Sequence, residues 1–351
     1  MTTPKVDEAT TRLIEQFRAS YPLKSIRQQF GETMLALAAE WPELLTLTAD
    51  LMFATGMEGF GAAYPDRLIN LGIAEQNMTG VAAGLALCGK LPVVCGYAAF
   101  TSLRAVEQAK LDCAYNGVKV ILTGQSAGLS YGVGGPTHQT FEDVAIMRAI
   151  PNMIVVVPSD PVEMHEILRA CVEHDRPSPI YVRLGRGPEY VYNGSARPIE
   201  IGKAVTLREG EDLCIVANGA MVFEALMAAE AFAQDGIDVR VLNMHTVKPI
   251  DGAAILDAAS RVRGMLVVEE HNVFGGLGSA VLEVLDGGHV CPVRRIGIED
   301  MFPPVGPPFE LRAAVGLSAA HIVSHGREML DGKGRGSMGH ERDNPDPRLR
   351  R

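Results

Sequence analysis

The sequence predicts an α/β protein with two open α/β/α domains. From about residue 45 to residue 185, short apolar runs alternate with helical stretches. The runs are continuously apolar, as is typical of parallel strands that helices cover on both faces. A polar stretch at 186–204 interrupts the alternation, and a second series of the same kind follows it. We therefore expect two domains joined by a linker.

The elements of the first domain are predicted from apolar runs and helix-start signals. Its strands are expected over 44–50, 68–73, 91–97, 118–124, 153–159 and 179–184. Its helices are expected after Glu75 and over 102–116, 140–150 and 160–174. The last helix should begin with Asp160 as its N-cap and Pro161 in its first position, where proline is favoured.

The second series repeats the pattern and sets the domain limits. Its strands are expected over 212–219, 238–244 and 264–270, and its helices over 220–236, 252–262 and 276–285. The predicted organisation is an N-terminal extension at 1–24, domains at 25–190 and 191–330, and a tail at 331–351. The tail is charged and rich in glycine and proline, so we expect it to be flexible.

The composition excludes several classes of protein. Among 351 residues, 47% are hydrophobic and 21% are charged, as in ordinary globular proteins. The net charge of -10 argues against nucleic-acid binding, because a phosphate backbone would be repelled. No segment predicts a membrane span or a signal peptide. Six scattered cysteines without a CxxC pair indicate reduced thiols in a cytoplasmic protein, with neither disulfides nor a zinc site.

Candidate site residues follow the strands of the first domain. They are Asp50, Glu75, Tyr97, Phe100, His138, Arg183 and Arg186. Open parallel sheets bind ligands at the carboxyl ends of their strands, so these side chains are expected at one edge. His138 lies in a glycine-rich loop at 124–139, where an exposed and irregular backbone is typical of a functional segment.

Ordinary structural roles remain open for these residues. Taken singly, Tyr97 and Phe100 are more typical of core aromatics, and the two arginines of surface charges. Asp50 is also compatible with a turn or cap. Glu75 is a carboxylate among apolar neighbours, which is costly unless something pairs with it. It either complements the dipole of the helix it begins or serves a functional site.

Five segments resemble the transketolase family. INLGIAEQNMTGVAAGLALCGKLPVVCGYAAF, GPTHQTFEDVAIMRAIPNM and VPSDP are similar to the pyrimidine-binding domain of transketolase and of deoxyxylulose-phosphate synthase. VLNMHTVKPID and LVVEEHNVFGGLGSAV are similar to the C-terminal domain of these enzymes. The resemblance extends over about residues 25 to 330. It implies a thiamine-diphosphate pyrimidine-binding fold followed by a transketolase C-terminal-like domain.

The resemblance implies a cofactor site. In the family, the glutamate that matches Glu75 hydrogen-bonds N1′ of the aminopyrimidine of thiamine diphosphate. A carboxyl group that shares its proton with this nitrogen favours the imino tautomer, which removes the C2 proton of the thiazolium. Tyr97 and Phe100 match aromatic residues that pack against the aminopyrimidine. Asp50 matches an aspartate near the cofactor.

The resemblance also implies a substrate site and a catalytic histidine. His138 matches the histidine of GPTHQ, a hydrogen-bond donor near the substrate oxygen that becomes charged on carbonyl attack. Arg186, and with it Arg183 and Arg27, matches or neighbours arginines that hold the terminal phosphate of the substrate. The implied reaction transfers a two-carbon ketol unit from a ketose to an aldose.

A partner subunit is implied by what the sequence lacks. The family binds Mg²⁺ and the diphosphate through a Gly-Asp-Gly motif with a following Asn, and this sequence has no such motif. The expected protein is the β subunit of a split transketolase, with no metal ligands of its own and inactive when alone. The partner would supply the diphosphate and metal site, and the expected assembly is α2β2.

Three substrate positions depart from the family pattern. Gly134 stands where many transketolases have an acidic residue, and Met52, Phe53 and Ala54 replace a Ser or Thr after the aspartate. The family also has a histidine that contacts the substrate phosphate, and this sequence has Gly124 and Gln125 at about that position. These changes predict a specialised ketose, either a branched sugar phosphate or a sugar with another terminal anion such as a sulfonate.

Two other functions remain as alternatives. One is an enzyme of another reaction class, either the E1 β subunit of a 2-oxo acid dehydrogenase or a deoxyxylulose-phosphate-synthase-like enzyme. GPTHQ argues against the dehydrogenase subunit, which does not usually carry it. The other is a subunit that only scaffolds or regulates. The presence of Glu75, Tyr97, Phe100 and His138 together argues against that function, because a scaffold needs none of them.

Overall fold

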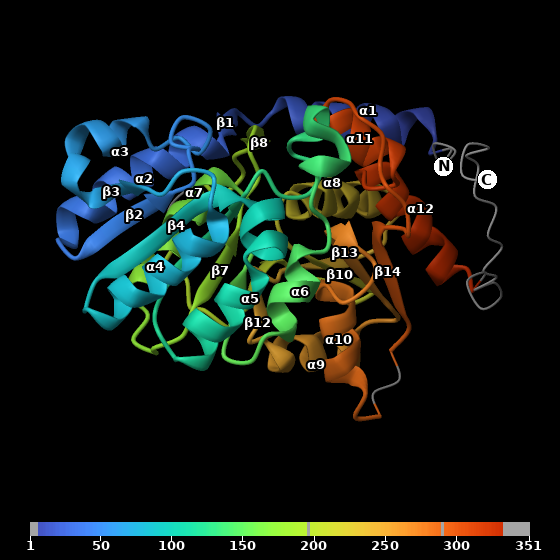
Figure 1. Ribbon diagram of the computed structural model, residues 1–351. Helices are drawn as coiled ribbons and strands as arrows, with labels where there is room; N and C mark the ends of the chain where they lie inside the picture. Colours follow the sequence, from blue (N-terminus) through green and yellow to red (C-terminus); the bar gives the residue numbers. More distant parts are fainter. Residues whose placement is uncertain (1–5, 195–196, 289–290, 333–351) are drawn as a thin grey trace, which may run out of the picture.

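The computed structural model describes residues 6–194, 197–288 and 291–332, and it contains two α/β units side by side (Figure 1). The first sheet has seven strands in the order β12-β6-β7-β5-β4-β2-β3. Their bounds are β2 Leu44–Thr48, β3 Leu68–Asn70, β4 Leu91–Tyr97, β5 Ile121–Gln125, β6 Ile154–Val156, β7 Ile180–Arg183 and β12 Thr246–Lys248. All neighbours are parallel except β12, which is antiparallel to β6.

Helices cover both faces of this sheet and enclose two apolar cores. One face carries α2 Ile26–Glu40, α3 Glu58–Ala63 and α7 Pro161–Glu173, and a 3-10 turn, η1 Pro65–Arg67, leads into β3. The other carries α4 Glu75–Leu87, α5 Val106–Gln108 and α6 Asp143–Ala149. Helix α7 begins as predicted, because Asp160 accepts a hydrogen bond from the amide of Glu163 at 2.8 Å and Pro161 follows it.

The second unit has a five-stranded sheet in the order β14-β13-β10-β11-β9. Its strands are β9 Val205–Arg208, β10 Leu213–Ala217, β11 Val239–Asn243, β13 Met265–Asn272 and β14 Val293–Ile298, and only β9 runs antiparallel. One face packs on α1 Glu8–Ala19, α8 Met221–Gln234, α11 Pro308–Ala314 and α12 Ala319–Leu330. The other packs on α9 Gly252–Arg261 and α10 Leu277–Leu285. The two-unit α/β/α prediction is confirmed.

The helix expected over 102–116 is irregular. It consists of a π-helical segment η2 (Ala99–Arg104), the short α5, and a second π-helical segment η3 (Ala109–Tyr115). The hydroxyls of Thr101 and Ser102 bond the carbonyls of Tyr97 and Ala98, four residues earlier. Such back-bonding competes with the regular helical ladder, and π turns are frequent at functional sites.

Several segments pack or pair outside the domain to which the sequence assigned them. Strand β12 follows the second unit's β11 in the chain but adds to the first unit's sheet. The polar stretch 186–204 contains a strand, β8 Pro188–Tyr190, which pairs with β1 Leu23–Ser25. Helix α1, in the predicted extension, packs on α8 with Phe17 and Phe223 rings 5.6 Å apart.

Buried ion pairs also join the units. Arg312 of α11 donates to Glu270 of β13 at 2.9 Å and to Glu189 of β8 at 2.6 Å. The tail expected at 331–351 lies outside the described residues from 333 onward. Within the ranges that the structure describes, no helix combines the length and hydropathy required to cross a bilayer.

Candidate functional site

Glu75 is the first residue of α4, at the carboxyl edge of the first sheet. Its side chain is buried, with 2% of the residue exposed. Oε2 accepts a hydrogen bond from Nη1 of Arg104 at 2.8 Å, so the buried charge has a partner. The carboxylate is not the helix cap, because Ala74 occupies that position without a side-chain bond. Glu75 therefore lies in the first turn of α4 and is also buried, as the sequence suggested.

Four rings gather beside this edge. Tyr97 ends β4, Phe100 lies on η2, and His138 lies in the loop after β5. The ring of His138 is 5.6 Å from that of Phe100 and 5.9 Å from that of Tyr97. Tyr131, which the sequence did not single out, lies 5.4 Å from His138 in an edge-on contact. The structure thus brings together three predicted residues and adds a fourth.

Arg186 joins this cluster from the segment after β7. Its guanidinium lies over the ring of Tyr131, 4.3 Å from the centroid, and 5.5 Å from that of Tyr97. It donates to the hydroxyl of Tyr97 and to Oγ of Ser126, the latter at 3.4 Å. The charge is half-buried and has no carboxylate partner among the described residues. A guanidinium held this way suits an anionic ligand.

His138 is held at the end of the turn η4 Gly132–Thr137, where Gly135 has φ +63. Nδ1 lies 2.8 Å from Oγ1 of Thr137, and that hydroxyl donates to the carbonyl of Gly134 at 3.2 Å. This contact occupies Nδ1 of the ring. Nε2 is then the nitrogen left for a ligand.

The loop that carries His138 is anchored to the second unit. Leu129 donates its amide to Glu270 at 2.5 Å, and Gln139 donates to the carbonyl of Pro304 at 3.0 Å. Gly128 and Thr140 form a bridge that closes the loop. The position of the histidine therefore depends on both units.

Gly134 has no room for a side chain. A Cβ there would lie 2.8 Å from Cβ of His138 and 3.0 Å from the ring of Tyr131. The ring of Tyr131 thus fills space that an acidic residue would need. The packing of this loop therefore leaves no space for the acidic side chain that many transketolases have at the position of Gly134.

Asp50 and Arg27 lie on the surface near the same edge. Asp50 follows β2 with φ 63, and its carboxylate accepts from Asn70 at 3.1 Å, which ties together the ends of β2 and β3. Arg27 of α2 donates to the carbonyl of Phe53 at 2.6 Å and reaches Glu58 at 3.4 Å. Both side chains remain accessible, so their predicted contacts with cofactor and substrate stay predictions.

Arg183 has a structural position that differs from the predicted one. It is buried, and its Nε donates to both oxygens of Asp143 at 2.9 and 3.0 Å. Its Nη2 donates to the carbonyls of Thr140 and Glu270. Because these bonds hold the guanidinium inside the protein, the geometry argues against the substrate contact expected for Arg183.

Arg104 and Tyr131 are the site residues that the sequence analysis missed. Arg104 lies on η2, and its guanidinium stacks on Phe100, 4.3 Å from the ring centroid. The spacing of four residues from Phe100 was a usable signal, since residues four apart share a helix face. For Tyr131, the only signal in the sequence was its position in the glycine-rich loop.

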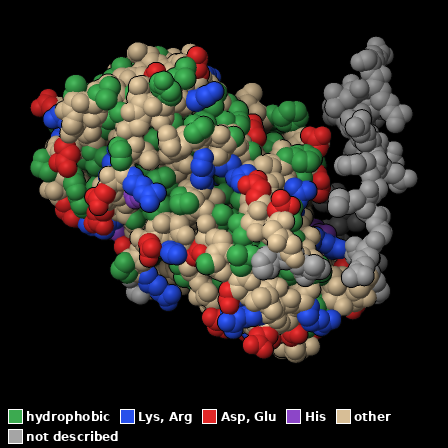
Figure 2. All heavy atoms as spheres, turned by 90° about the horizontal axis from the view of Figure 1, so that it is seen from below, with side chains coloured by type: hydrophobic (Ala, Val, Ile, Leu, Met, Phe, Trp, Pro, Cys, Tyr) green, Lys and Arg blue, Asp and Glu red, His purple; other side chains and the backbone are tan. Residues whose placement is uncertain are grey.

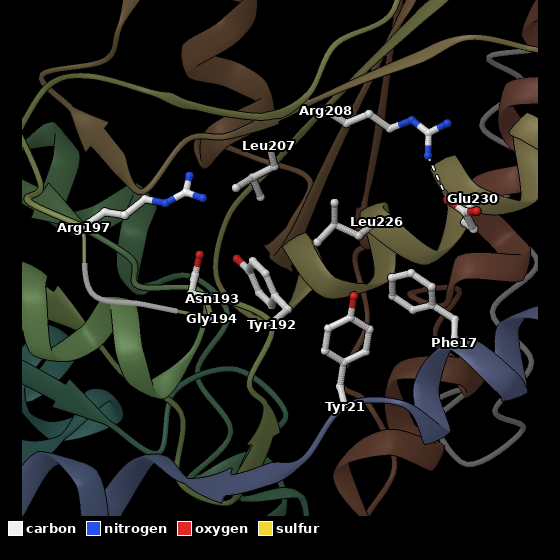
Figure 3. A pocket seen from close by; sticks show the side chains of 10 residues that line it. All are labelled: Phe17, Tyr21, Tyr192, Asn193, Gly194, Arg197, Leu207, Arg208, Leu226 and Glu230. Atoms are coloured by element: carbon white, nitrogen blue, oxygen red, sulfur yellow. Dashed lines mark hydrogen bonds and ion pairs between the residues drawn. The ribbon is translucent and has the colours of Figure 1, made fainter.

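Two pockets of the described residues lie away from this group of side chains. A cavity of about 360 Å³ lies between α1, α8 and β9, with the aromatic side chains of Phe17, Tyr21 and Tyr192 turned toward it (Figure 3). A second, of about 30 Å³, lies where Arg183, Glu270 and Arg312 meet. Neither is lined by Glu75 or His138.

Comparisons with known proteins identify the family. The transketolase pyrimidine-binding domain matches residues 24–188, and the transketolase C-terminal domain matches residues 202–322. A 6-deoxy-6-sulfo-D-fructose transketolase subunit from Clostridium sp. (strain MSTE9) is 40% identical, over 88% of this chain and 95% of its own length. An apulose-4-phosphate transketolase subunit from Phocaeicola vulgatus is 38% identical, over 87% of this chain and 97% of its own length.

A solved structure agrees with these matches. This structure, a split gene transketolase described as an inactive beta4 tetramer, has a TM-score of 0.80 and 36% identity to this chain, and the match covers 88% of this chain and 98% of that one. The resemblance read from the AEQN helix and GPTHQ is therefore confirmed. The chain belongs to the transketolase family, and it is a transferase subunit of the split type that carries the pyrimidine-binding and C-terminal domains.

Proposed function

We propose that this chain is the thiamine-diphosphate-binding β subunit of a split transketolase, with Glu75 as the residue that binds the aminopyrimidine. The observation that carries the proposal is the buried carboxylate of Glu75 at the carboxyl edge of a parallel sheet. The guanidinium of Arg104 contacts both this carboxylate and the ring of Phe100. The carboxylate and the ring are therefore close enough for a single planar group to contact both. A flat heterocycle with a ring nitrogen fits such a pair.

Each of these side chains would have a separate role in ketol transfer. When bound, thiamine diphosphate supplies a nucleophilic C2 carbon for attack on the ketose carbonyl. Glu75 exchanges a proton with the ring nitrogen, and Phe100 and Tyr97 exclude water from the ring. His138 presents Nε2 to the substrate oxygen on which charge develops. Arg186 holds the terminal anion of the sugar.

The proposal also includes a partner subunit that completes the coenzyme site. Mg²⁺ and the diphosphate would be held by a separate chain, in an α2β2 assembly. Large apolar side chains exposed on or beside α4, η2 and η3 support contacts with other chains: Ile73, Leu87, Leu103, Leu111 and Tyr115. In Figure 2 the first unit is on the left, and hydrophobic side chains are frequent on its surface. Exposed apolar groups of this kind favour protein interfaces.

The chain alone is expected to show no ketol transfer with thiamine diphosphate and Mg²⁺. The reason is that the diphosphate end of the coenzyme would have no ligands. Adding the separately purified partner chain should restore turnover, as followed by coupled detection of the aldose product. Turnover by the isolated chain would contradict the two-chain proposal.

The substrate is proposed to be a ketose with a terminal anion. Arg186 has no carboxylate partner in the part of the chain that the structure describes, which supports this, as do relatives named for a sulfo sugar and a sugar phosphate. The crowded Gly134 supports a donor preference different from that of transketolases with an acidic residue there. The cytoplasmic location is proposed from the six free cysteines, four of them buried.

Replacing Arg186 by methionine in the two-chain enzyme is expected to lower kcat/KM about 10- to 100-fold, mainly through KM. A hydrogen bond to a charged group contributes about 1.5–3 kcal/mol, which corresponds to this range. Steady-state kinetics with a phosphorylated or sulfonated ketose measure the effect. A neutral ketose lacking the anion should respond little to the same substitution. Equal losses with charged and neutral donors would remove Arg186 from the anion site.

A further inference from the structure

Arg104 contacts both groups that the proposed function gives to the coenzyme ring. Its Nη1 donates to Oε2 of Glu75 at 2.8 Å. The same guanidinium lies over the ring of Phe100, 4.3 Å from its centroid. The side chain of Arg104 is 47% exposed, whereas that of Glu75 is 2% exposed. The arginine therefore covers the carboxylate from the solvent side.

The chemistry of these two contacts matches that of an aminopyrimidine. A guanidinium is planar, carries N–H donors and stacks on aromatic faces. A ring that lies on Phe100 and hydrogen-bonds Glu75 uses the same two partners. The ion pair with Arg104 needs Glu75 to carry its full charge. A carboxyl group that shares its proton with a ring nitrogen carries less than its full charge, so binding of the ring weakens the pair with Arg104, and the ring also needs the face of Phe100 that Arg104 covers.

Without the coenzyme, the carboxylate would be a buried charge with no other partner. Its only side-chain bond among the described residues is the one to Arg104. An uncompensated buried charge is strongly unfavourable, so a counter-ion at this position stabilises the empty chain. Because half of the arginine is exposed, it can turn into solvent without leaving a buried cation behind.

We propose that Arg104 is a placeholder for the aminopyrimidine: it pairs with Glu75 and covers Phe100 in the empty subunit, and it withdraws when the coenzyme ring binds. This inference rests on the proposed function. It makes Arg104 a positioning residue, because it holds Glu75 in place before binding and competes with the ring during binding. Arg104 thereby holds the side chain of Glu75 in place until the coenzyme binds.

The test compares coenzyme affinity in the assembled two-chain protein, measured by calorimetry with thiamine diphosphate at fixed Mg²⁺. Arg104→Met keeps the apolar stem and removes the competing charge. Binding is expected to tighten about 3- to 30-fold, since removing a competing conformation raises the binding-competent fraction. Arg104→Lys, which keeps the charge, should remain close to wild type. In a Glu75→Gln background, Arg104→Met should change affinity little.

Each outcome decides between the proposals. Equal or weaker binding by Arg104→Met, with normal binding by wild type, would overturn the placeholder and leave the proposed function intact. Failure of the wild-type complex to bind the coenzyme would overturn both. The matched control is Arg169→Met, which also loses an ion pair, with Glu40 at 2.8 Å, and a ring contact, with Trp41 at 5.5 Å. It should leave affinity unchanged.

A second measurement does not need the coenzyme. In the isolated chain, Arg104→Met should lower the thermal unfolding temperature, and adding Glu75→Gln should recover most of the loss. Such coupling is the signature of a direct pair in a double-mutant cycle. Independent effects of the two substitutions would overturn the pairing on which the placeholder depends.

Discussion

Glu75→Gln is expected to lower ketol transfer by the two-chain enzyme about 10²- to 10⁴-fold while leaving the fold intact, because that range is typical for loss of a positioned acid–base group. Glutamine has nearly the same shape and still accepts a hydrogen bond from Arg104. It cannot exchange a proton with a ring nitrogen. The measurement is kcat with saturating coenzyme, together with thermal unfolding of the same preparation.

A matched control for this substitution is Glu8→Gln. Glu8 also lies in a first helical turn and pairs with an arginine, Arg12, but it is exposed on α1. Its replacement should leave kcat within about twofold of wild type, as is usual for a surface change away from the site. A Glu75→Gln enzyme with comparable activity would show that the buried carboxylate has only the structural role of complementing the helix.

Arg312→Met is expected to destabilise the chain by about 3–5 kcal/mol, the range for breaking a buried ion pair by removing one partner. Arg312 is 3% exposed and lies between Glu189 and Glu270. Its loss would leave two carboxylates buried where the units meet. Denaturant unfolding of the isolated chain measures the change. The exposed pair of Arg327 and Asp235 provides the control, since Arg327→Met should cost no more than about 1 kcal/mol.

The pH dependence of this variant follows from Glu189. Burial raises the pKa of Glu189 above its usual value, against the opposing effect of Arg312. Without Arg312 the folded-state pKa should rise further above that of the unfolded chain. The folded state then binds more protons than the unfolded state between these two values, so stability falls as pH rises through that window. The deficit of Arg312→Met should be larger at pH 8 than at pH 5. A deficit independent of pH would contradict this account.

The ion pair of Arg312 and Glu270 also contacts the loop that carries His138, the proposed catalytic histidine. Glu270 bonds both Arg312 and the amide of Leu129, and Leu129 begins the loop that carries His138. A change at Arg312 therefore acts on the histidine through two contacts. This connection spans both units, and by it the second unit supports the loop of the proposed site.

The gathering of Tyr97, Phe100, His138 and Arg186 could be predicted because each follows a parallel strand. Parallel strands place their carboxyl ends at one edge, so order along the chain gives position in space. Arg183 shows that a position at a strand end does not set the direction of the side chain. It ends the same strand that leads to Arg186, but its guanidinium turns toward Asp143, which lies 40 residues earlier. The direction of a side chain at a strand end depends on which partner is packed beside it.

The sequence by itself determined the α/β alternation, the helix start at Asp160 and the family, because these depend on local periodicity and on motifs. Only the tertiary structure decided that Arg104 pairs with Glu75, that Tyr131 fills the space beside Gly134, and that β12 joins the first sheet. These contacts join residues far apart in the chain, or depend on volumes left between side chains. No local pattern encodes such distances, since packing fixes them only once both units have folded.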